Sequence, residues 1–353
     1  MFTQKRYLEK ILIAIGCLLV IGLTVKYTEG GNMRDRIKER MKERMEEKSS
    51  KGPFYPLIEG KFSSYTQSQY GGGDYRRYLE FDGRKRFYDL HIPRKYNKEK
   101  STPVVLVFHG GGGNPAQQRN DSQMDTVSDT HEFIVVYPAG TGESEDKLLT
   151  YNAGVCCGYA KENDIDDVGF TKALLDDLET LFHIDKKRIY ASGFSNGAFM
   201  CYRLAMELSD RIAAFAPVSG VLGVEPSTCK SNSPVSIIHF HGKADPNVVF
   251  NGGVGPKAFE KISRRSVPET IQFWVTHNGC PKEPVKGSRI GKAVCTIYGH
   301  GKEGSEVILW TLEDGGHTWP GGKSSLPERQ VGKLNTDIFA SELMWQFFER
   351  HPK

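Results

Sequence analysis

Residues 188–200 read RIYASGFSNGAFM, and this stretch decides how the rest of the sequence is interpreted. A short apolar run enters Gly193, Ser195 stands between two glycines, and small and apolar residues follow. The pattern G-x-S-x-G between a strand and a helix is typical of a sharp turn that exposes a serine hydroxyl. Glycines suit such a turn because it leaves no room for Cβ atoms beside it. We predict Ser195 at this tip; an ordinary glycine-bounded turn is the alternative.

Apolar stretches that fit buried strands alternate with segments of helical periodicity on both sides of this turn. The expected strands cover residues 75–81, 85–92, 103–110, 133–139, 188–193, 212–220, 236–242 and 307–313, and the expected helices cover residues 169–183, 198–208, 267–278 and 335–350. Asp82 and Gly83 are predicted to form the turn of a hairpin between the first two strands. The alternation predicts an α/β fold with a mostly parallel, twisted central sheet flanked by helices.

The length and the charge of the chain limit what it can be. Its 353 residues exceed the size at which a single core stops growing, about 250–300 residues, so we expect one catalytic domain, residues 75–353, with an N-terminal extension. Lys and Arg number 47 and Asp and Glu 43, which gives a net charge of +4. This excess is small and evenly spread, so no nucleic-acid partner is expected.

The N-terminal 30 residues have the pattern of a targeting segment. Lys5, Arg6 and Lys10 precede an uncharged apolar stretch, residues 11–25. This stretch is shorter than the ~20 residues that span a bilayer and fits the apolar region of a signal peptide. Residues 1–30 are therefore predicted to be a cleaved signal peptide or an uncleaved anchor that tethers the protein to a membrane. Both place the catalytic domain outside the cytoplasm; a buried helix is the alternative.

Residues 31–74 are predicted to separate the targeting segment from the catalytic domain. Residues 33–48 alternate charges on a helical period, which indicates a solvated spacer helix supported by i,i+4 pairs. A weak coiled-coil seam is the alternative. Residues 49–74 are rich in Ser, Gly, Tyr and Gln, which is typical of a linker.

Six cysteines lie beyond the apolar N-terminal stretch, and this even number indicates disulfide bonds formed in an oxidising compartment. The pair predicted first is Cys280–Cys295, because the two residues flank a short polar segment that could fold back on itself. A bridge between the neighbours Cys156 and Cys157 would be strained, so each is expected to have a distant partner. Six free thiols in a cytosolic enzyme are the alternative.

A serine hydroxyl becomes a good nucleophile only when a base takes its proton. In the fold that carries G-x-S-x-G, the acid and then the histidine follow the serine along the chain. Asp245 comes just after the expected strand 236–242, and His317 lies in a glycine-rich loop after the strand 307–313. We predict that His317 is the base for Ser195 and that Asp245 holds the tautomer of His317. A turn-forming role for Asp245 is the alternative.

The sequence HGGGGN, residues 109–114, forms a second glycine loop after a strand. A phosphate-binding loop is excluded because the Gly-Lys-Ser/Thr ending is missing. The interpretation that remains is an oxyanion loop, whose backbone N–H groups approach a tetrahedral intermediate. We assign the donors to Gly110 or Gly111, with Gly111 favoured, together with Asn196.

Other titratable residues compete for the catalytic roles. His109, His239 and His241 are not in the chain order or the loop position that the base requires, so structural roles are predicted for them. Asp314 is only three residues before His317 and is too local to orient it.

Several ordered motifs allow the chain to be compared with a known family. They are HGGGGN (109–114), YPAGT (137–141), YNAGVCCG (151–158), DIDDVGF (164–170), RIYASGFSNGAFM (188–200), HFHGKADP (239–246) and GGHTWPGG (315–322). With them, residues 75–350 resemble the polyhydroxybutyrate depolymerase/feruloyl esterase family of secreted α/β-hydrolases. The resemblance implies Ser195 as nucleophile, Asp245 as acid partner and His317 as base. It also implies that neither a metal nor an organic cofactor is needed.

The resemblance adds further expectations. Tyr151 stands where the family often has Trp and is expected to line the acyl pocket, as is Trp319; packing is the alternative for Trp319. Asp166 and Asp167 could be read as a metal pair or as acid/base carboxylates. The favoured role is structural: they cap the helix that begins near Gly169 and pin the pocket loop.

The sequence thus predicts an extracytoplasmic serine ester hydrolase that works through an acyl-enzyme intermediate. Its expected substrates are feruloyl or acetyl esters of polysaccharides, or hydroxyalkanoate esters. A catalytically inactive, membrane-tethered binding protein on a hydrolase scaffold is the alternative.

Overall fold

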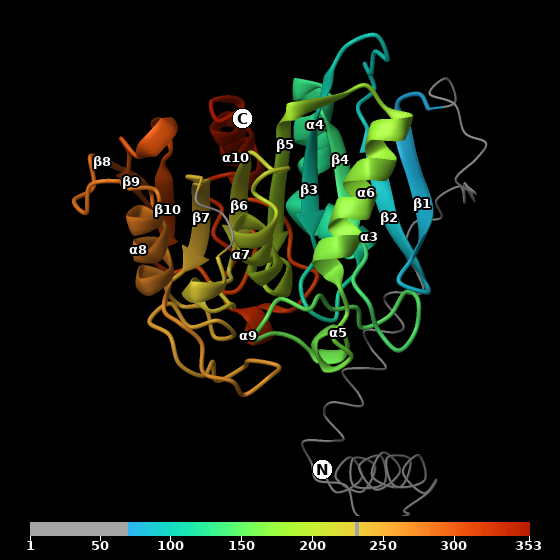
Figure 1. Cartoon of the computed structure of the whole chain (residues 1–353). Helices are drawn as coiled ribbons and strands as arrows, with labels where there is room; N and C mark the ends of the chain where they lie inside the picture. The colour runs from blue at the N-terminus through green and yellow to red at the C-terminus, as the bar shows by residue number, and fades with distance from the viewer. Residues whose placement is uncertain (1–69, 230–232) are drawn as a thin grey trace, which may run out of the picture. The chain divides into compact units, whose positions relative to one another are not determined.

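The computed structural model describes residues 70–229 and 233–353 (Figure 1). Its strands are β1 (Gly73–Phe81), β2 (Arg84–Ile92), β3 (Thr102–Phe108), β4 (Ile134–Pro138), β5 (Ile184–Phe194), β6 (Ala214–Val218), β7 (Ser236–Gly242), β8 (Lys286–Ile290), β9 (Ala293–Tyr298) and β10 (Val307–Leu312). Its α-helices are α3 (Pro115–Ser122), α4 (Met124–His131), α5 (Gly158–Glu162), α6 (Asp167–Leu181), α7 (Asn196–Glu207), α8 (Val267–His277), α9 (Glu328–Val331) and α10 (Ala340–Glu349). Single 3-10 turns occur at Pro226–Thr228 and Lys302–Gly304.

All ten strands form one sheet in the order β1-β2-β4-β3-β5-β6-β7-β10-β9-β8. The central strands, from β4 through β3, β5, β6 and β7 to β10, run parallel. The antiparallel pairs are at the two ends, where β1 and β2 form the predicted hairpin about Asp82 and Gly83. The prediction of an α/β fold with a mostly parallel sheet is confirmed. The carboxyl ends of the parallel strands meet at one edge, where sites in open α/β sheets are found.

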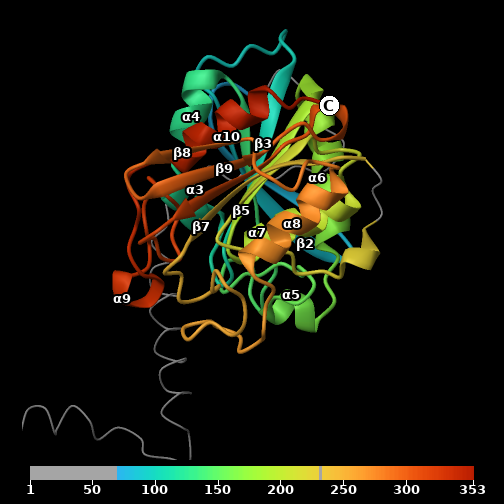
Figure 2. The same ribbon diagram turned by 90° about the vertical axis from the view of Figure 1, so that its left-hand side faces the viewer.

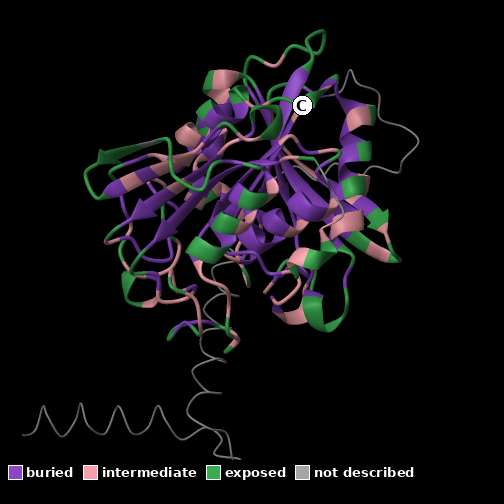
Figure 3. Ribbon diagram, turned by 60° about the vertical axis from the view of Figure 1, so that its left-hand side comes forward, coloured by how far each residue is buried: buried purple, intermediate pink, exposed green. Residues whose placement is uncertain are grey.

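Helices cover both faces of the sheet (Figures 1 and 2). Along β3, Val104 and Leu106 belong to a core that includes side chains of α6, α7 and α8. The intervening Val105 and Val107 belong to a second core with α4 and α10. Alternation along a strand places neighbours on opposite faces, so these two cores lie on opposite sides of the sheet. Figure 3 shows the strands buried between the helical layers.

The predictions for residues 1–69, which include the targeting segment, the spacer helix and most of the linker, lie outside the described residues. Within residues 70–229 and 233–353, no helix is both long and apolar enough to cross a membrane. The strand β1 begins at Gly73, slightly before the predicted start of the catalytic domain at residue 75.

The predicted bond between Cys280 and Cys295 is wrong in this structure, because both cysteines are free. Cys280 packs in the core with α6, α7 and α8, and Cys295 packs in the opposite core. The sheet therefore separates the two thiols. The segment between them does fold back, as the antiparallel pair of β8 and β9. The expectation of distant partners for Cys156 and Cys157 is also wrong, since these neighbours are bonded to one another.

Candidate active site

Ser195 occupies the predicted turn between a strand and a helix. β5 ends at Phe194, Ser195 has φ 52° and ψ −116°, and α7 begins at Asn196. A Cβ at Gly193 would clash with the backbone of Gly197, and a Cβ at Gly197 would clash with the carbonyl of Phe108. Only glycine fits at both positions, which is the close approach that the sequence predicted. The tight turn holds the serine in a left-handed conformation that non-glycine residues rarely adopt.

The structure brings Ser195, His317 and Asp245 together. His317 Nε2 lies 2.8 Å from Ser195 Oγ, and His317 Nδ1 lies 2.7 Å from Asp245 Oδ2. A carboxylate only accepts, so Nδ1 carries the proton and Nε2 is free to accept from the serine hydroxyl. Both His317 and Asp245 are buried, at 5% and 3% exposure. Burial strengthens these contacts by excluding water.

The loops that carry Asp245 and His317 pack against each other and are joined by a backbone hydrogen bond. Asp245 follows β7 and His317 follows β10, which are parallel neighbours in the sheet. Ala244 N–H donates to Gly315 O at 3.0 Å, and a side chain at Gly242 would clash with the Gly315 backbone. Asp245 Oδ1 accepts from the backbone N–H groups of the two residues that follow Pro246, each at 2.8 Å. The carboxylate is therefore fixed on one oxygen while the other faces His317.

The glycine loop after β3 lies against the nucleophile. A Cβ at Gly110 would be 3.5 Å from Ser195 Cβ, and a Cβ at Gly111 would be 3.4 Å from Asn196 Cβ. Gly112 N–H is bonded to Leu149 O, and Gly113 N–H is bonded to Gly110 O. These bonds leave Gly110 and Gly111 as the loop's candidate donors, which agrees with the prediction. Their role in holding an oxyanion stays a prediction.

His109 supports this loop from beneath. Its Nδ1–H donates to Gly110 O at 2.8 Å, and its Nε2 accepts from Gly140 N–H at 3.0 Å. Burial lowers the pKa of His109 to about 4, against a smaller raising effect of the bond to Gly110. The imidazole is therefore neutral and joins the glycine loop to the segment after β4. The predicted structural role is confirmed by these contacts.

The side chain of Asn196 ties the nucleophile's helix to the loop at residues 151–158. Asn196 Oδ1 accepts from Tyr151 N–H at 2.7 Å, and Asn196 Nδ2 donates to Tyr151 O at 3.0 Å. One residue further, Asn152 N–H donates to Asp167 Oδ2 at 2.7 Å. Asp167 also forms a buried ion pair with Arg86, whose Nη2 lies 2.7 Å from Oδ1.

These contacts confirm the predicted structural roles of the two aspartates. Asp166 caps α6, with its carboxylate accepting from Gly169 N–H at 2.8 Å, and Asp167 pins the loop. Arg86 was missed by sequence reasoning. It lies on β2, far from Asp167 along the chain, and no local pattern marks it as the ion-pair partner.

Tyr151 and Trp319 were predicted to line the substrate pocket. Tyr151 is 1% exposed, its hydroxyl donates to Pro138 O at 2.7 Å, and it accepts from His109 N–H at 3.3 Å. Trp319 is 2% exposed and its indole N–H donates to Ser341 Oγ at 3.0 Å. Both side chains therefore support the site by packing, and contact with a substrate stays a prediction.

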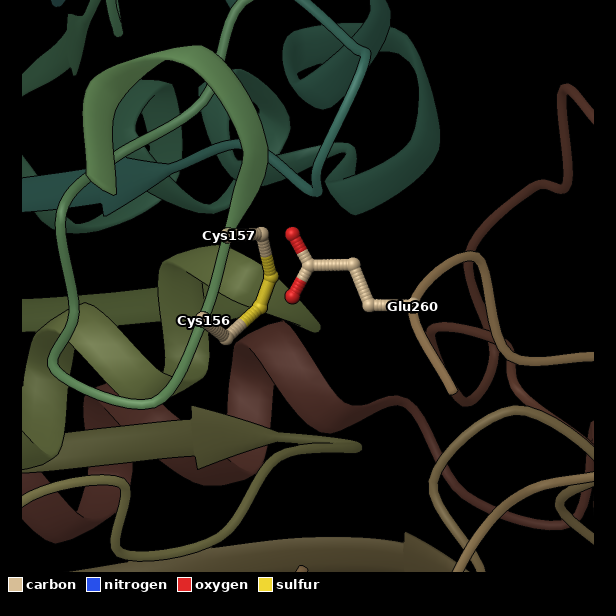
Figure 4. Close-up of side chains that lie close together, drawn as sticks. All are labelled: Cys156, Cys157 and Glu260. Atoms are coloured by element: carbon tan, nitrogen blue, oxygen red, sulfur yellow. A yellow bond between two sulfur atoms is a disulfide. The ribbon is translucent and has the colours of Figure 1, made fainter. Parts of the chain in front are cut away.

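The bonded pair Cys156–Cys157 lies beside Glu260 (Figure 4). Glu260 reaches across from the segment between β7 and α8, and its Oε1 accepts from Gly158 N–H at 2.6 Å. Cys156 Sγ lies 3.6 Å from Asn196 Nδ2. Glu260, which sequence reasoning missed, thus links that segment to the loop that holds Asn196. Sulfurs bonded to each other offer no thiolate ligands, so this cluster is not assigned to a metal.

Asp74, His91 and Asp125 form a second cluster whose side-chain atoms lie close enough to share an ion. The guanidinium of Arg119 lies 2.7 Å from each of the two carboxylates. A cationic side chain therefore already balances these acids.

Comparisons with known proteins find similarity to esterases. Residues 160–282 match the family model described as Phospholipase/Carboxylesterase. The chain is 30% identical over 238 residues to "Feruloyl esterase B" of Piromyces equi, a match that covers 66% of this chain and 43% of that protein. It is 27% identical over 282 residues to "Putative esterase NocK" of Nocardia uniformis subsp. tsuyamanensis, covering 75% of this chain and 79% of that protein.

A solved structure shows the same fold. The S-formylglutathione hydrolase of Agrobacterium tumefaciens superposes with a TM-score of 0.51 at 12% identity, covering 80% of this chain and 97% of that one. At this identity the likeness concerns the fold alone. The chain thus has the α/β-hydrolase fold, residues 160–282 of it match the phospholipase/carboxylesterase model, and its sequence is similar to that of a protein named as a feruloyl esterase.

Proposed function

We propose that this protein hydrolyses carboxylic esters with Ser195 as nucleophile, His317 as general base and acid, and Asp245 as the partner that orients His317. The observation that carries the proposal is the pair of contacts of 2.8 Å and 2.7 Å that join the three side chains in this order. Serine hydrolases of unrelated folds share this arrangement, which is recognised by its geometry.

The reaction proceeds in two steps. His317 Nε2 takes the proton of Ser195 as Oγ attacks the ester carbonyl carbon, and the carbonyl oxygen becomes negative. N–H groups of Asn196 and of Gly110 or Gly111 stabilise this oxygen at the amino end of α7. His317 then gives the proton to the departing alcohol, which leaves an acyl-Ser195 ester. Water attacks this ester, His317 takes the water's proton and returns it to Ser195, and the carboxylic acid is released.

The substrate class that we favour is the feruloyl ester of a polysaccharide. The support is the similarity to the feruloyl esterase of Piromyces equi, of which this chain covers less than half. Acetyl esters of polysaccharides and hydroxyalkanoate esters are the other candidates.

The proposal includes a location outside the cytoplasm. The support is the basic residues Lys5, Arg6 and Lys10 followed by the apolar stretch 11–25. Two results would agree with this location: the folded domain is released from cells after signal cleavage, or it is retained on the outer face of the membrane of intact cells. Full protection from protease added to intact cells would contradict this location.

The test compares the wild-type protein with Ser195→Ala on p-nitrophenyl butyrate. Loss of the nucleophile should lower kcat by at least roughly 10³–10⁴-fold with the circular dichroism unchanged. Ser192→Ala is the matched control, because Ser192 lies on the same strand but donates to Ala216 O within the core. Near-normal turnover by Ser195→Ala would contradict the proposal.

Two further measurements test the proposed function and its substrate class. A fluorophosphonate probe should label the wild type and not Ser195→Ala; an unlabelled wild type without esterase activity would favour the binding-protein alternative. Methyl ferulate, acetylated xylan and hydroxybutyrate oligomers, assayed side by side, rank the substrate classes by kcat/KM. The highest value on methyl ferulate is the expected result.

A further inference from the structure

Three buried polar rings, Tyr202, His239 and His241, are joined in a row that ends at the loop after β7, which carries Asp245. Tyr202 is on α7, the helix that begins next to the nucleophile, and His239 and His241 point from the same face of β7. All three are buried, with exposed fractions of 0%, 0% and 1%. The mechanism above gives these residues no part, although burying a polar group is costly unless it is hydrogen-bonded.

The three rings are joined by hydrogen bonds that end at the acid loop. Tyr202 Oη lies 2.8 Å from His239 Nδ1, and His239 Nε2 lies 3.1 Å from His241 Nδ1. His241 Nε2 lies 2.8 Å from Val248 O and 3.5 Å from Asp245 Oδ2. Val248 N–H in turn donates to Asp245 Oδ1 at 2.8 Å. His241 thus bonds the carbonyl of Val248 while Asp245 bonds its N–H, and the two contacts hold the loop from Asp245 to Val248 closed.

The acceptors at the end of this chain fix the direction of every bond. Val248 O and the Asp245 carboxylate can only accept, so His241 Nε2 must carry a proton. His241 Nδ1 then accepts from His239 Nε2–H if both rings are neutral. It follows that His239 Nδ1 accepts from the Tyr202 hydroxyl. The tautomer of His241 is therefore fixed by Val248 O, and the row of hydrogen bonds that it directs ends at a group on the helix that follows the nucleophile.

The surroundings keep both imidazoles neutral. Burial lowers the pKa of His239 and of His241, and in His241 it outweighs the raising effects of Asp245 and the carbonyl of Val248. His317 is the other titratable group that acts on His241, and it lowers the pKa further. Phe250 packs against the ring of His241 and Trp274 against that of Tyr202, and neither side chain carries a charge. Cys201, beside Tyr202, stays a thiol because burial raises its pKa.

We propose that His241 is a positioning residue of the active site: a neutral imidazole, protonated on Nε2, that holds the loop of Asp245 closed and keeps the carboxylate aimed at His317. His239, which accepts from Tyr202, donates to Nδ1 and so keeps that nitrogen unprotonated. This inference rests on the proposed function, because it assigns His241 a role in the reaction of Ser195.

Neutrality matters because of what a charged His241 would do. A second proton on Nδ1 would face the N–H of His239 at 3.1 Å, so two donors would oppose each other. An imidazolium at 241 would also compete with His317 for Asp245 and would oppose the positive charge that His317 gains during catalysis. The bond from His239 occupies the one lone pair through which His241 could become charged.

Three variants test the role. His241→Leu removes the donor to Val248 O and fills the space with an apolar side chain. His241→Gln is the conservative rescue, because an amide can donate to Val248 O and accept from His239. Tyr202→Phe removes the first donor of the chain at a distance from the reacting atoms. Tyr190→Phe is the matched control: Tyr190 is buried, but its hydroxyl has no hydrogen-bond partner among the described residues.

We expect His241→Leu to lower kcat on p-nitrophenyl butyrate by about 10–100-fold with KM within about twofold, because alignment and not substrate binding is lost. His241→Gln should recover most of this loss, and Tyr202→Phe should cost roughly two- to fivefold, the scale of one buried hydrogen bond. A loosened Asp245 supports the His317 imidazolium less well. The acid limb of the pH dependence of kcat/KM should therefore move to lower pH by roughly 0.5–1 unit in His241→Leu.

Each result counts for or against the role. An unchanged kcat and acid limb in a folded His241→Leu protein would overturn it, as would a glutamine variant no better than leucine. If His241→Leu does not fold, Tyr202→Phe decides: activity and acid limb equal to those of Tyr190→Phe would overturn the inference. Failure of the proposed function looks different, because Ser195→Ala would then be as active as the wild type, or the wild type would be inert.

Discussion

The two sides of Ser195 are held by different kinds of contact. On the side of His317 and Asp245, side chains bond to side chains or to single peptide groups at the ends of β7 and β10. On the side of Gly110 and Gly111, the proposed chemistry is assigned to backbone N–H groups. Side chains such as His109 and Asn196, together with the Arg86–Asp167 ion pair, hold the backbone there.

This difference follows from what each side does in the proposed mechanism. A proton must move on the acid–base side, so an imidazole of suitable pKa and a fixed tautomer is required. Charge must be stabilised without proton transfer on the oxyanion side, and backbone N–H groups do this because they do not titrate. Turnover should therefore be sensitive to hydrogen-bond direction on the acid–base side and to backbone position on the oxyanion side.

Asp245→Asn disrupts the acid–base side most directly and should give the largest loss of kcat. The amide can still accept from the two backbone N–H groups on one oxygen, but it can present an N–H to His317 and stabilise the wrong tautomer. We expect kcat to fall by about 10³–10⁴-fold, the loss known for such a change in a triad. The measurement is kcat on p-nitrophenyl butyrate together with a thermal melt.

A loss below about tenfold for Asp245→Asn, with the fold intact, would contradict the assignment of Asp245 as the orienting acid. Asp314→Asn is the comparison variant. Asp314 binds Lys292 at 2.9 Å and Lys333 at 2.6 Å, not His317. Its replacement should leave kcat within about twofold, because exposed ion pairs contribute little.

Asp167→Ala tests the support of the oxyanion side. The change leaves Arg86 as an unpaired charge at 4% side-chain exposure and removes the acceptor for Asn152 N–H. Breaking a buried pair in this way should destabilise the protein by about 3–5 kcal/mol. Asp166→Ala, one residue away, removes only a helix cap and should cost about 1 kcal/mol. Urea unfolding of the two variants measures the contrast; equal losses would show that the ion pair does not hold this side.

The sequence predicted the acid–base side more fully than the oxyanion side, and the reason is physical. Ser195, Asp245 and His317 each follow a strand of the parallel sheet, and parallel topology brings the ends of such strands to one edge. Their side-chain chemistry then limits the roles that each can take. The glycine loop was found for the same reason, since it follows β3.

What the sequence did not predict depends on pairs of residues far apart in the chain. Arg86 pairs with Asp167, and Glu260 bonds to Gly158, through loops that no local pattern relates. Cys280 and Cys295 were paired from their spacing, but the sheet lies between them. Spacing along the chain does not reveal which face of a sheet a residue occupies when the strand itself, here β9, has not been predicted.

Gly111→Ala sharpens the comparison by changing the backbone of the oxyanion side while every hydrogen-bonding side chain stays in place. A Cβ at this position would lie 3.4 Å from Asn196 Cβ, at the short limit of an ordinary contact, so only a small displacement of the loop is expected. We expect kcat to fall by about 10-fold with KM and the melting temperature little changed, as for a weakened oxyanion donor. Gly71→Ala is the control, because a Cβ there meets nothing within 4 Å. Equal kcat in the two variants would contradict a donor role for this part of the loop.

His109→Gln shows whether the neutral imidazole that bonds the glycine loop contributes to the pH dependence of stability. The folded-state pKa of His109 is lowered to about 4, below the ordinary histidine value of about 6.5. The unfolded chain therefore binds a proton that the folded chain does not. The resulting stability is complete above pH ~6.5 and is lost as the pH falls toward 4, with a slope of up to about 1.4 kcal/mol per pH unit for one proton. His109→Gln should reduce the slope of unfolding free energy between pH 6.5 and 4 while His239 and His241 keep theirs. Identical slopes in the two proteins, measured by urea unfolding, would mean that His109 takes up a proton as readily in the fold as in the unfolded chain. That outcome would contradict the hydrogen bond that His109 Nε2 accepts from Gly140 N–H.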